Sequence, residues 1–362
     1  MKKKDKKTII VGLSGGIDSA VSAAILKQQG YNIIGVTLQI GNKKTHKLAQ
    51  NACFGAKEKE NIYLAKKIAK KLGIKHKVFD LSSEFEEYVL KYFRKEYLAG
   101  RTPNPCVVCN QKIKFGYLFD KILKSGINFD YFATGHYAQI KYDLKQKRYL
   151  MYRGKDEKKD QSYFLYRLSQ AQLKKIIFPL GDYTKQEVKK LAEKLGLQEF
   201  VSKKESQDFV RQENYGKIIG KKGLKPGEII NLEGKIIGQH QGLANFTIGQ
   251  RKGLNIGGLK KPYYVAFLDV SRNQVIIGRK EQIFSQEFEI EKSKWISFKE
   301  LKKAIKAKVK IRSGSDFFDC EIRPLKKIFK IKLSRPAFAV TAGQSAVFYR
   351  KNEVLGGGII KK

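Results

Sequence analysis

A hexapeptide near the N-terminus carries the side chains best suited to phosphate chemistry. Residues 14–19, Ser-Gly-Gly-Ile-Asp-Ser, follow an apolar, β-branched stretch, Thr8–Leu13, and precede a helix-type apolar repeat. Paired glycines let backbone N–H groups turn toward one anion, and a helix start adds partial positive charge. Ser14 and Ser19 can donate hydroxyl hydrogen bonds, and Asp18 can hold a Mg²⁺ ion that bridges phosphates. A glycine turn followed by a capped helix would explain the same residues, but strand, loop and helix together favour a phosphate site.

Thiol chemistry is the second possibility, because the chain has four cysteines, Cys53, Cys106, Cys109 and Cys320. They are too few and too unevenly spaced for a disulfide framework. Cys109 is either a small buried hydrophobic residue or a nucleophile. Beside a cationic phosphate site its pKa is expected to be lowered. Cys320 lies in Phe317–Ile322, which is typical of an ordinary strand.

The chain has a large excess of positive charge. Its 74 basic and 34 acidic side chains give a formal net charge of +40, which favours a polyanionic partner such as a nucleic acid. Compositional bias explains part of this excess, since 61 of the basic residues are Lys and 13 are Arg. No apolar run reaches the roughly 18–20 residues of a membrane span, and Thr8–Leu13 is too short for a signal-peptide core. We therefore expect a cytoplasmic protein that has no contact with membranes.

The first half of the chain alternates between strand-like and helix-like segments. This alternation predicts an α/β domain with a Rossmann-like parallel sheet covered by helices on both faces. The expected strands are residues 8–13, 33–38, 77–81 and 129–133, and the expected helices are 17–29, 62–72, 169–177 and 185–195.

After about Gln212 the sequence becomes rich in glycine and short strands, which predicts a small β-barrel or sandwich at the C-terminus. Three domains are therefore expected. They are a catalytic domain, 1–212, a connecting and RNA-binding module, 213–282, and a C-terminal β-barrel domain, 283–362. The loop Gln250–Gly253 is either a solvated turn or an RNA-facing loop.

Residues 14–19 resemble the pyrophosphate loop of the N-type ATP pyrophosphatases (PP-loop superfamily), which adenylate a substrate oxygen and release pyrophosphate. The loop lacks the Lys of a Walker motif. Further segments resemble one branch of that superfamily, the bacterial tRNA-specific 2-thiouridylases, in family order and over nearly the whole chain. These segments are Gly100–Gly116, Ala133–Ala138, Lys159–Leu165, Phe246–Gly258, Ala339–Tyr349 and Val354–Gly358.

The resemblance implies a sulfurtransferase that uses ATP and Mg²⁺. Such an enzyme adenylates the C2 oxygen of the wobble uridine of tRNA, position 34, and a sulfur nucleophile then displaces AMP to give 2-thiouridine. The partners implied are tRNA with a uridine at position 34 and a sulfur donor, which is a cysteine desulfurase, a relay protein or free sulfide.

The resemblance also implies roles for individual residues. The ATP site would comprise Gly12, Leu13, Ser14, Gly15, Gly16, Ile17, Asp18, Ser19, Leu38 and Gly135. Cys109 matches the family's nucleophile, and Asn104, Pro105 and Cys106 would lie next to the target base. The remaining positions expected to contact tRNA are His136, Lys159, Asp160, Gln161, Arg312, Ser313 and Gln344.

The chain departs from the family at two places. Cys106 stands where many members have an acidic residue. The segment Lys204–Val210 also lacks the second catalytic cysteine that carries the persulfide. One hypothesis is that Cys53, Cys106 and Cys109 hold a 4Fe–4S cluster whose open iron presents sulfide. The alternative is a local relay, in which one of Cys106 and Cys109 carries the persulfide and the other resolves it.

Other functions remain open at this stage. A different PP-loop ATP pyrophosphatase acting on tRNA, such as a lysidine synthetase, would need the phosphate loop but not the Cys106–Cys109 pair. A degenerate, inactive paralogue would explain the lost cysteine. A non-catalytic RNA-binding protein with structural zinc would need four ligands, and a second Cys-x-x-Cys or His pair is missing.

Overall fold

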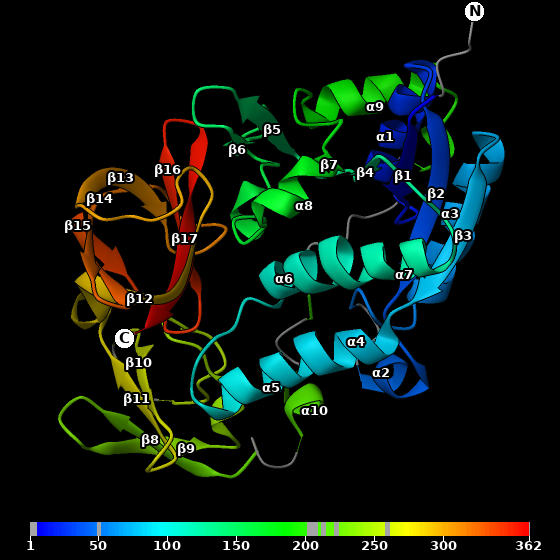
Figure 1. Ribbon diagram of the computed structural model, residues 1–362. Coiled ribbons are helices and arrows are strands. Elements are labelled where there is room, and N and C mark those ends of the chain that lie inside the picture. The colour runs from blue at the N-terminus through cyan, green and yellow to red at the C-terminus, as the bar shows by residue number, and fades with distance from the viewer. Residues whose placement is uncertain are drawn as a thin grey trace, which may run out of the picture. The chain divides into compact units, whose positions relative to one another are not determined.

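The computed structural model describes residues 6–48, 52–200, 209–210, 215–220, 224–257 and 261–361 (Figure 1). The chain forms two compact units. The first consists of Met1–Tyr88, Cys106–Phe209 and Asn352–Val354, and the second of Val89–Pro105, Val210–Lys351 and Leu355–Lys362. Both units are therefore built from segments that are distant in the sequence. The expected boundary between residues 212 and 213 lies outside the described residues.

The first unit contains the expected parallel sheet. Its strands are ordered β3-β2-β1-β4-β7, and every pairing in it is parallel. The central strands are the most buried, with Ile9, Ile10 and Val11 of β1 and Phe132 of β4 fully enclosed, as in a sheet covered on both faces. The strands are β1 (Thr8–Gly12), β2 (Asn32–Gln39), β3 (Lys75–Asp80), β4 (Tyr131–Ala133) and β7 (Ile176–Ile177).

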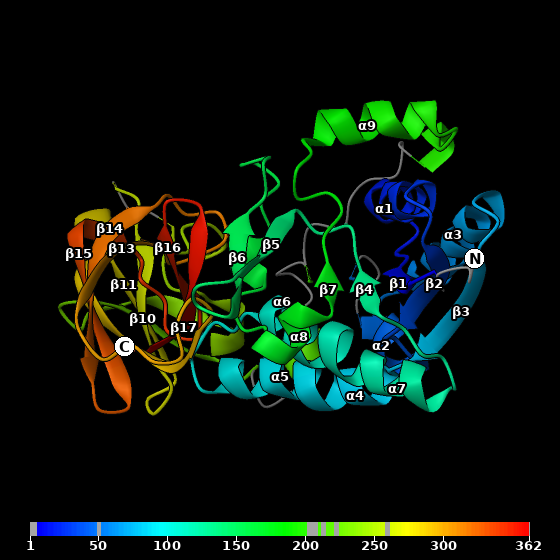
Figure 2. The same ribbon diagram turned by 45° about the horizontal axis from the view of Figure 1, so that its top comes forward.

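Helices cover both faces of this sheet. On one face α1 (Ile17–Gln28), α3 (Glu58–Lys71) and α9 (Lys185–Lys194) share one apolar core with β1. On the other face α7 (Leu118–Lys124) packs through Phe119 and its neighbours against the aromatic side chains of β4. Figure 2 shows α1 and α9 on one side of the strands and α7 on the other. The prediction of a parallel α/β domain is confirmed.

Several short elements complete the first unit, and a hairpin follows β4. The strands of this hairpin, β5 (Ala138–Asp143) and β6 (Arg148–Arg153), are antiparallel, and Glu353 and Val354 pair with β6. The short helical elements are α2 (Lys43–Leu48), α4 (Ser82–Phe85), α6 (Pro105–Val108), the π-helical segment η2 (Cys109–Tyr117) and α8 (Gln170–Lys174). The first residue of α6, Pro105, still belongs to the second unit.

The second unit begins with α5 (Lys91–Leu98), which packs on α10 (Tyr215–Ile219) through the rings of Phe93, Tyr97 and Tyr215. A four-stranded sheet of order β10-β11-β8-β9 forms the connecting module. Its strands are β8 (Gly227–Asn231), β9 (Ile236–His240), β10 (Tyr264–Asp269) and β11 (Gln274–Gly278).

The C-terminal strands form a closed six-stranded barrel, because β12 pairs with both β15 and β17. Closure removes sheet edges, and alternate side chains fill the interior. The buried thiol of Cys320 is one of them, and burial raises its pKa to about 12, as suits an ordinary strand residue. The strands are β12 (Phe284–Trp295), β13 (Ile305–Lys310), β14 (Phe318–Leu325), β15 (Ile328–Phe338), β16 (Ser345–Arg350) and β17 (Glu353–Lys361).

No helix among the described residues is long and apolar enough to cross a membrane.

Candidate active site

The phosphate loop lies where the strand order of the parallel sheet reverses direction. β1 lies between β2 and β4, and the loop joins the end of β1 to α1. Leu38 is at the end of β2, and Gly135 follows β4. In open α/β sheets, ligands bind in the crevice at this switch point. The topology therefore places the predicted nucleotide-binding residues of the first unit at one end of the parallel sheet.

Two glycines permit the close packing of this loop. Gly15 has a φ of +75°, and a Cβ there would lie 2.5 Å from the Asn61 carbonyl oxygen. A Cβ on Gly135 would lie 2.8 Å from the Asp18 carbonyl carbon and 2.9 Å from the Ser19 nitrogen. Any larger residue at either position would push the loop or the start of α1 away.

Two serines hold the loop in its turn. The Ser19 hydroxyl donates to the Gly16 carbonyl at 2.8 Å and accepts from the Ser14 N–H at 3.2 Å. The hydroxyl oxygens of Ser14 and Ser19 are 3.4 Å apart. Ser14 is exposed and Ser19 is buried. Ser14 is therefore accessible to a ligand, whereas Ser19 mainly stabilises the loop.

Asp18 forms the strongest polar contacts of the loop. Its carboxylate accepts from Lys185 Nζ at 2.7 and 2.8 Å and from the Tyr137 hydroxyl at 2.8 Å. The Asp18 side chain is 25% exposed and that of Lys185 is 12% exposed, so water screens this ion pair only partly. The sequence did not indicate that Lys185 and Tyr137 are the partners of Asp18.

Lys185 reaches the loop because it is the first residue of α9. Thr184 caps this helix and forms a reciprocal capping box with Glu187. The Lys185 backbone N–H also donates to Asp156 at 2.9 Å. The Thr-x-x-Glu pattern could have identified the helix start, but nothing local indicates that Lys185 faces Asp18.

The predicted nucleophile lies on a short helix that begins at Pro105, a residue favoured in the first helical turn. Cys106 and Cys109 are three residues apart across α6 and the start of η2, so they lie on one helical face. Cys106 is partly buried and Cys109 is 9% exposed. Pi-helical insertions of this kind often occur at functional sites.

The electrostatics of Cys109 differ from the sequence-based expectation. A lowered pKa was expected beside a cationic site, but burial raises the pKa of the Cys109 thiol. The positive charge of Lys114 opposes this effect and is the smaller of the two influences. Desolvation penalises the thiolate more than one nearby ammonium stabilises it. Lys114 is a further residue that sequence reasoning missed.

Cys53 lies close enough to the Cys106–Cys109 pair for their charges to interact. Burial raises the pKa of Cys53 well above its usual value, and the negative charges of Cys109 and Cys106 raise it further. The hypothesis that the three thiols act together stays a prediction. In the described part of the chain, however, no three His, Cys, Asp or Glu side chains are arranged to hold a metal ion.

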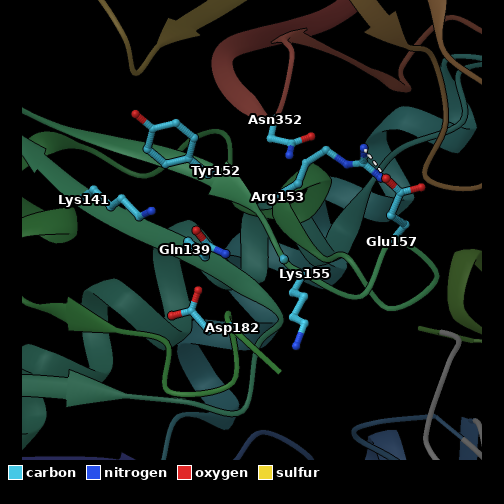
Figure 3. Close-up of a pocket in the computed structure, with 9 residues that line it drawn as sticks. Gln139, Lys141, Tyr152, Arg153, Lys155, Glu157, Asp182 and Asn352 are labelled. Carbon is cyan, nitrogen blue, oxygen red and sulfur yellow. Dashed lines mark ion pairs between the residues drawn. The ribbon is translucent and has the colours of Figure 1, made fainter. Parts of the chain in front are cut away.

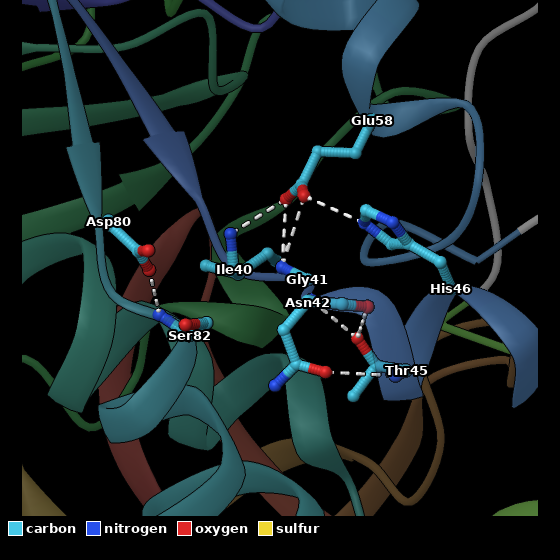
Figure 4. Close-up of polar contacts among 8 residues, drawn as sticks. All are labelled: Ile40, Gly41, Asn42, Thr45, His46, Glu58, Asp80 and Ser82. Carbon is cyan, nitrogen blue, oxygen red and sulfur yellow. Dashed lines mark hydrogen bonds and ion pairs between the residues drawn. The ribbon is translucent and has the colours of Figure 1, made fainter.

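A buried carboxylate anchors the segment that carries Cys53 (Figure 4). Glu58, at the start of α3, is 4% exposed and accepts from the N–H of Ile40 at 2.7 Å and of Gly41 at 3.0 Å. His46 Nε2 lies 3.3 Å from the same carboxylate. Glu58 thus ties the end of β2 to α2 and to the start of α3, and so holds both ends of the segment around Cys53.

His136 is largely occupied by protein contacts. Its Nδ1 lies 2.7 Å from the Thr134 hydroxyl, and its ring lies 5.9 Å from that of Phe115 and 5.7 Å from that of Phe178. Burial, helped by Lys114, lowers the pKa of His136 well below its usual value. The ring is therefore neutral at pH 7.

Asp160 and Gln161 also have protein partners. The Asp160 side chain is 3% exposed and accepts from the Gly154 N–H at 3.1 Å and from the Ser162 hydroxyl at 3.0 Å. The Gln161 side-chain oxygen accepts from the Tyr137 N–H at 3.2 Å. These contacts shape the loop, and Lys159 beside them is partly exposed.

The second unit contains the other predicted tRNA-contacting residues. The Gln344 amide donates to the carbonyls of Thr102 and Pro103 at 3.2 and 3.3 Å, directly before Asn104, which is 9% exposed. Arg312 donates to the carbonyls of Ile248 and Ala339, each at 2.9 Å. Pro105 is buried and Ser313 is exposed.

Some of the predictions lie outside the described residues. They concern residues 204–208, where the second catalytic cysteine is missing, and Gly258 at the end of one family-like segment.

A parallel α/β sheet with a glycine–serine loop at its switch point defines a nucleotide-binding enzyme of the PP-loop class. Comparison with known proteins narrows this class. Residues 7–211 match the family described as tRNA methyl transferase HUP domain. Residues 215–279 match a tRNA methyl transferase PRC-barrel domain, and residues 285–360 match an aminomethyltransferase beta-barrel domain.

Close relatives match over almost the full chain. A tRNA-specific 2-thiouridylase of Caldanaerobacter subterraneus subsp. tengcongensis is 45% identical over 363 residues, 98% of each chain. That of Acetivibrio thermocellus is 43% identical, covering 98% of this chain and 99% of its own. That of Endomicrobium trichonymphae is 45% identical, covering 97% and 98% respectively. The chain belongs to the tRNA-specific 2-thiouridylase family.

Proposed function

We propose that this protein is a tRNA 2-thiouridylase, which uses ATP to replace the C2 oxygen of uridine 34 with sulfur. The observation that carries this proposal is that one compact unit holds both a phosphate loop and three interacting thiols. The loop supplies activation of oxygen, and the thiols supply sulfur. A tRNA substrate also fits the net charge of +40, part of which is compositional bias, and we infer a cytoplasmic location from it.

In the first half-reaction, the uridine O2 attacks the α-phosphorus of ATP, and pyrophosphate leaves. The backbone N–H groups of Gly15 and Gly16 and the start of α1 would stabilise the departing phosphates. When ATP binds, its phosphates offer Lys185 a second anionic partner beside Asp18. Magnesium is usually held by one or two carboxylates together with nucleotide phosphates, and Asp18 fits that role. The bound ion would neutralise charge on the pyrophosphate.

In the second half-reaction, we assign the persulfide to Cys109. Its terminal sulfur attacks C2 of the adenylated uridine, and AMP leaves. The Cys106 thiolate then attacks Sγ of Cys109 and breaks the S–S bond, so that sulfur stays on the uridine and a Cys106–Cys109 disulfide forms. The two electrons that reduce the sulfane sulfur come from the thiolates of Cys106 and Cys109. A dithiol reductant then reduces the Cys106–Cys109 disulfide back to two thiols. The donor that loads Cys109 is a cysteine desulfurase, a relay protein or sulfide with an oxidant.

The competing proposal is a 4Fe–4S cluster on Cys53, Cys106 and Cys109. The three thiols interact, but they are not arranged as a metal site in the described structure, so we derive no step through a cluster. Anaerobic purification followed by iron and sulfide analysis separates the two proposals. Full thiolation by iron-free protein would leave the relay, and activity strictly proportional to bound iron would favour the cluster.

The predicted tRNA contacts divide into two groups. Lys159 and Ser313 are accessible and would bind phosphates directly. Asp160, Gln161, Arg312 and Gln344 form hydrogen bonds within the protein that shape RNA-facing segments. We assign these four a positioning role. We assign Asn104 and Pro105 of the second unit a contact with the target base, and His136 of the first unit a separate contact with the tRNA.

Nucleoside mass spectrometry tests the proposed function directly. Purified protein is incubated with unmodified tRNA, ATP, Mg²⁺, a cysteine desulfurase with cysteine as the persulfide source, and a dithiol reductant. 2-Thiouridine should form only when position 34 is uridine, together with AMP and pyrophosphate. Asp18→Ala should abolish the product while circular dichroism stays unchanged. Release of ADP, or a methylated uridine in place of 2-thiouridine, would contradict the assignment.

A further inference from the structure

The first unit contains a polar cavity that none of the roles above uses (Figure 3). It has a volume of about 410 Å³, within the range of roughly 300–1,000 Å³ common for small-molecule sites. Its walls come from the β5–β6 hairpin, the loop after β6, the loop before α9 and the turn before β17. The lining residues are Gln139, Lys141, Tyr152, Arg153, Gly154, Lys155, Glu157, Asp182 and Asn352.

Two glycines bring these segments together. A Cβ on Gly154 would lie 2.9 Å from the Tyr137 carbonyl group, and a Cβ on Gly181 would lie 2.2 Å from the Ala138 carbonyl oxygen. The backbone before Asp182 and after Arg153 can therefore approach β5 closely. The Arg153 N–H donates to the Asn352 carbonyl at 2.8 Å, which places the turn before β17 at the same rim.

The cavity combines cations with an aromatic ring. Lys141 Nζ lies 5.6 Å from the centre of the Tyr152 ring. Lys155 pairs with Glu187 at 2.8 Å, but both side chains are about half exposed, so this pair is weak and easily exchanged for a phosphate. Arg153 is different, because its side chain is 11% exposed and lies between Asp160 and Glu157. Lys141 and Lys155 are therefore the cations available to a ligand.

The cavity also has groups that recognise base edges. Asn352 presents an exposed amide and Asp182 an exposed carboxylate, while the Gln139 amide nitrogen donates to the Gly181 carbonyl at 3.3 Å. Amides pair with adenine, and carboxylates accept from the amino groups of cytosine or guanine. Tyr152 offers a ring face on which a base can stack. Cations, an aromatic face and base-reading groups around one cavity are the chemistry of a nucleotide site.

We propose that this cavity binds one nucleotide of the tRNA other than the target uridine, with its phosphate toward Lys141 and Lys155 and its base edge toward Asp182. This inference rests on the proposed tRNA substrate. Its position supports it, since Asp160 connects the cavity wall, through Arg153 and Gly154, to the family-like Lys159–Leu165 segment. A free nucleoside monophosphate has the same chemistry and is the alternative source.

Equilibrium binding of the full-length protein to fluorescent tRNA tests the proposal at several salt concentrations. Lys141→Ala should weaken binding about five- to tenfold and lower the log–log salt slope by about one unit, the effect of one lost phosphate contact. Lys145→Ala is the matched control, because Lys145 is exposed in the same hairpin but does not line the cavity. The control should change binding less than twofold.

Asp182→Asn tests base recognition separately from charge attraction. It should weaken tRNA binding several-fold, although it removes a negative charge that repels phosphates. The KM for tRNA should rise with kcat unchanged in both cavity variants. Equal effects of Lys141→Ala and Lys145→Ala would overturn the proposal.

A nucleotide of tRNA and a free nucleoside monophosphate are distinguished as ligands by testing the wild-type protein with each of the four nucleoside 5′-monophosphates. Binding of one of them that Asp182→Asn abolishes, with tRNA affinity unchanged, would assign the cavity to a free nucleotide and overturn the tRNA assignment. Because tRNA binding is the readout, a protein that binds tRNA through this cavity but forms no 2-thiouridine would refute only the proposed function.

Discussion

Lys185 donates to Asp18 through two hydrogen bonds of 2.7 and 2.8 Å, although the residues are 167 positions apart. The phosphate loop itself lacks the lysine that a Walker motif carries. Here a cation reaches the loop from the start of α9 instead. We therefore propose that the loop and the start of α9 bind phosphates together.

Replacing this lysine should impair catalysis more than binding. Lys185→Met should lower kcat for tRNA-dependent pyrophosphate release by about 100-fold, because a charge that stabilises the departing phosphates is lost. Lys189→Met, on the exposed side of the same helix, is the control and should retain near-normal activity. Radiolabelled ATP measures both. Unchanged kcat in Lys185→Met would show that the lysine serves only to hold Asp18.

Variants of the cysteines should separate the two half-reactions. Cys109→Ser should abolish 2-thiouridine formation but retain tRNA-dependent pyrophosphate release, since the thiol acts only after adenylation. Cys320→Ser, in the barrel wall, should be fully active. Cys53→Ser should keep most of its thiolation under the relay and lose it under the cluster. Nucleoside mass spectrometry and pyrophosphate assays report the two steps independently.

The pH dependence of thiol alkylation should reveal the environment of Cys109. Because burial raises its pKa, the thiol is protonated at pH 7, and the alkylation rate should increase as the pH rises above the usual thiol range. Lys114 lowers that pKa, so Lys114→Met should shift the profile to still higher pH. Lys112→Met, on an exposed neighbour, should leave it unchanged. Mass spectrometry of the modified Cys109 peptide provides the rates.

A lower pKa for Cys109 in Lys114→Met than in the wild type would contradict this electrostatic account. Saturating ATP should move the profile to higher pH, because added phosphates bring negative charge to the unit that holds the thiol.

Glu58 should contribute measurably to stability. Glu58→Gln keeps the shape of the side chain but replaces the charged acceptor of two backbone N–H groups, so the free energy of unfolding should fall by about 1–3 kcal/mol. Glu60→Gln, two residues later and exposed, should change it by less than about 0.5 kcal/mol. Urea unfolding measures both. Faster alkylation of Cys53 in Glu58→Gln alone would show that the anchor also holds that segment.

Local pattern sufficed for the elements around the phosphate loop. The expected strands at residues 8–13 and 33–38 correspond to β1 and β2, and the helix expected at 185–195 corresponds to α9. Alternation, helical spacing and capping residues all act within a few positions along the chain, so they can be read in sequence. The hairpin of β5 and β6 and the helices between residues 82 and 124 were not predicted, because their apolar residues pack against distant partners.

The sequence by itself determined the phosphate loop, the candidate nucleophile and the class of fold, since each depends on residue types at short spacing. Only the tertiary structure decided which cation faces Asp18, how burial outweighs Lys114 at Cys109, and that Cys53 lies near the Cys106–Cys109 pair. It also decided that Arg312 and Asp160 form hydrogen bonds inside the protein. Desolvation and long-range pairing depend on what packs around a side chain, and no local pattern contains that information.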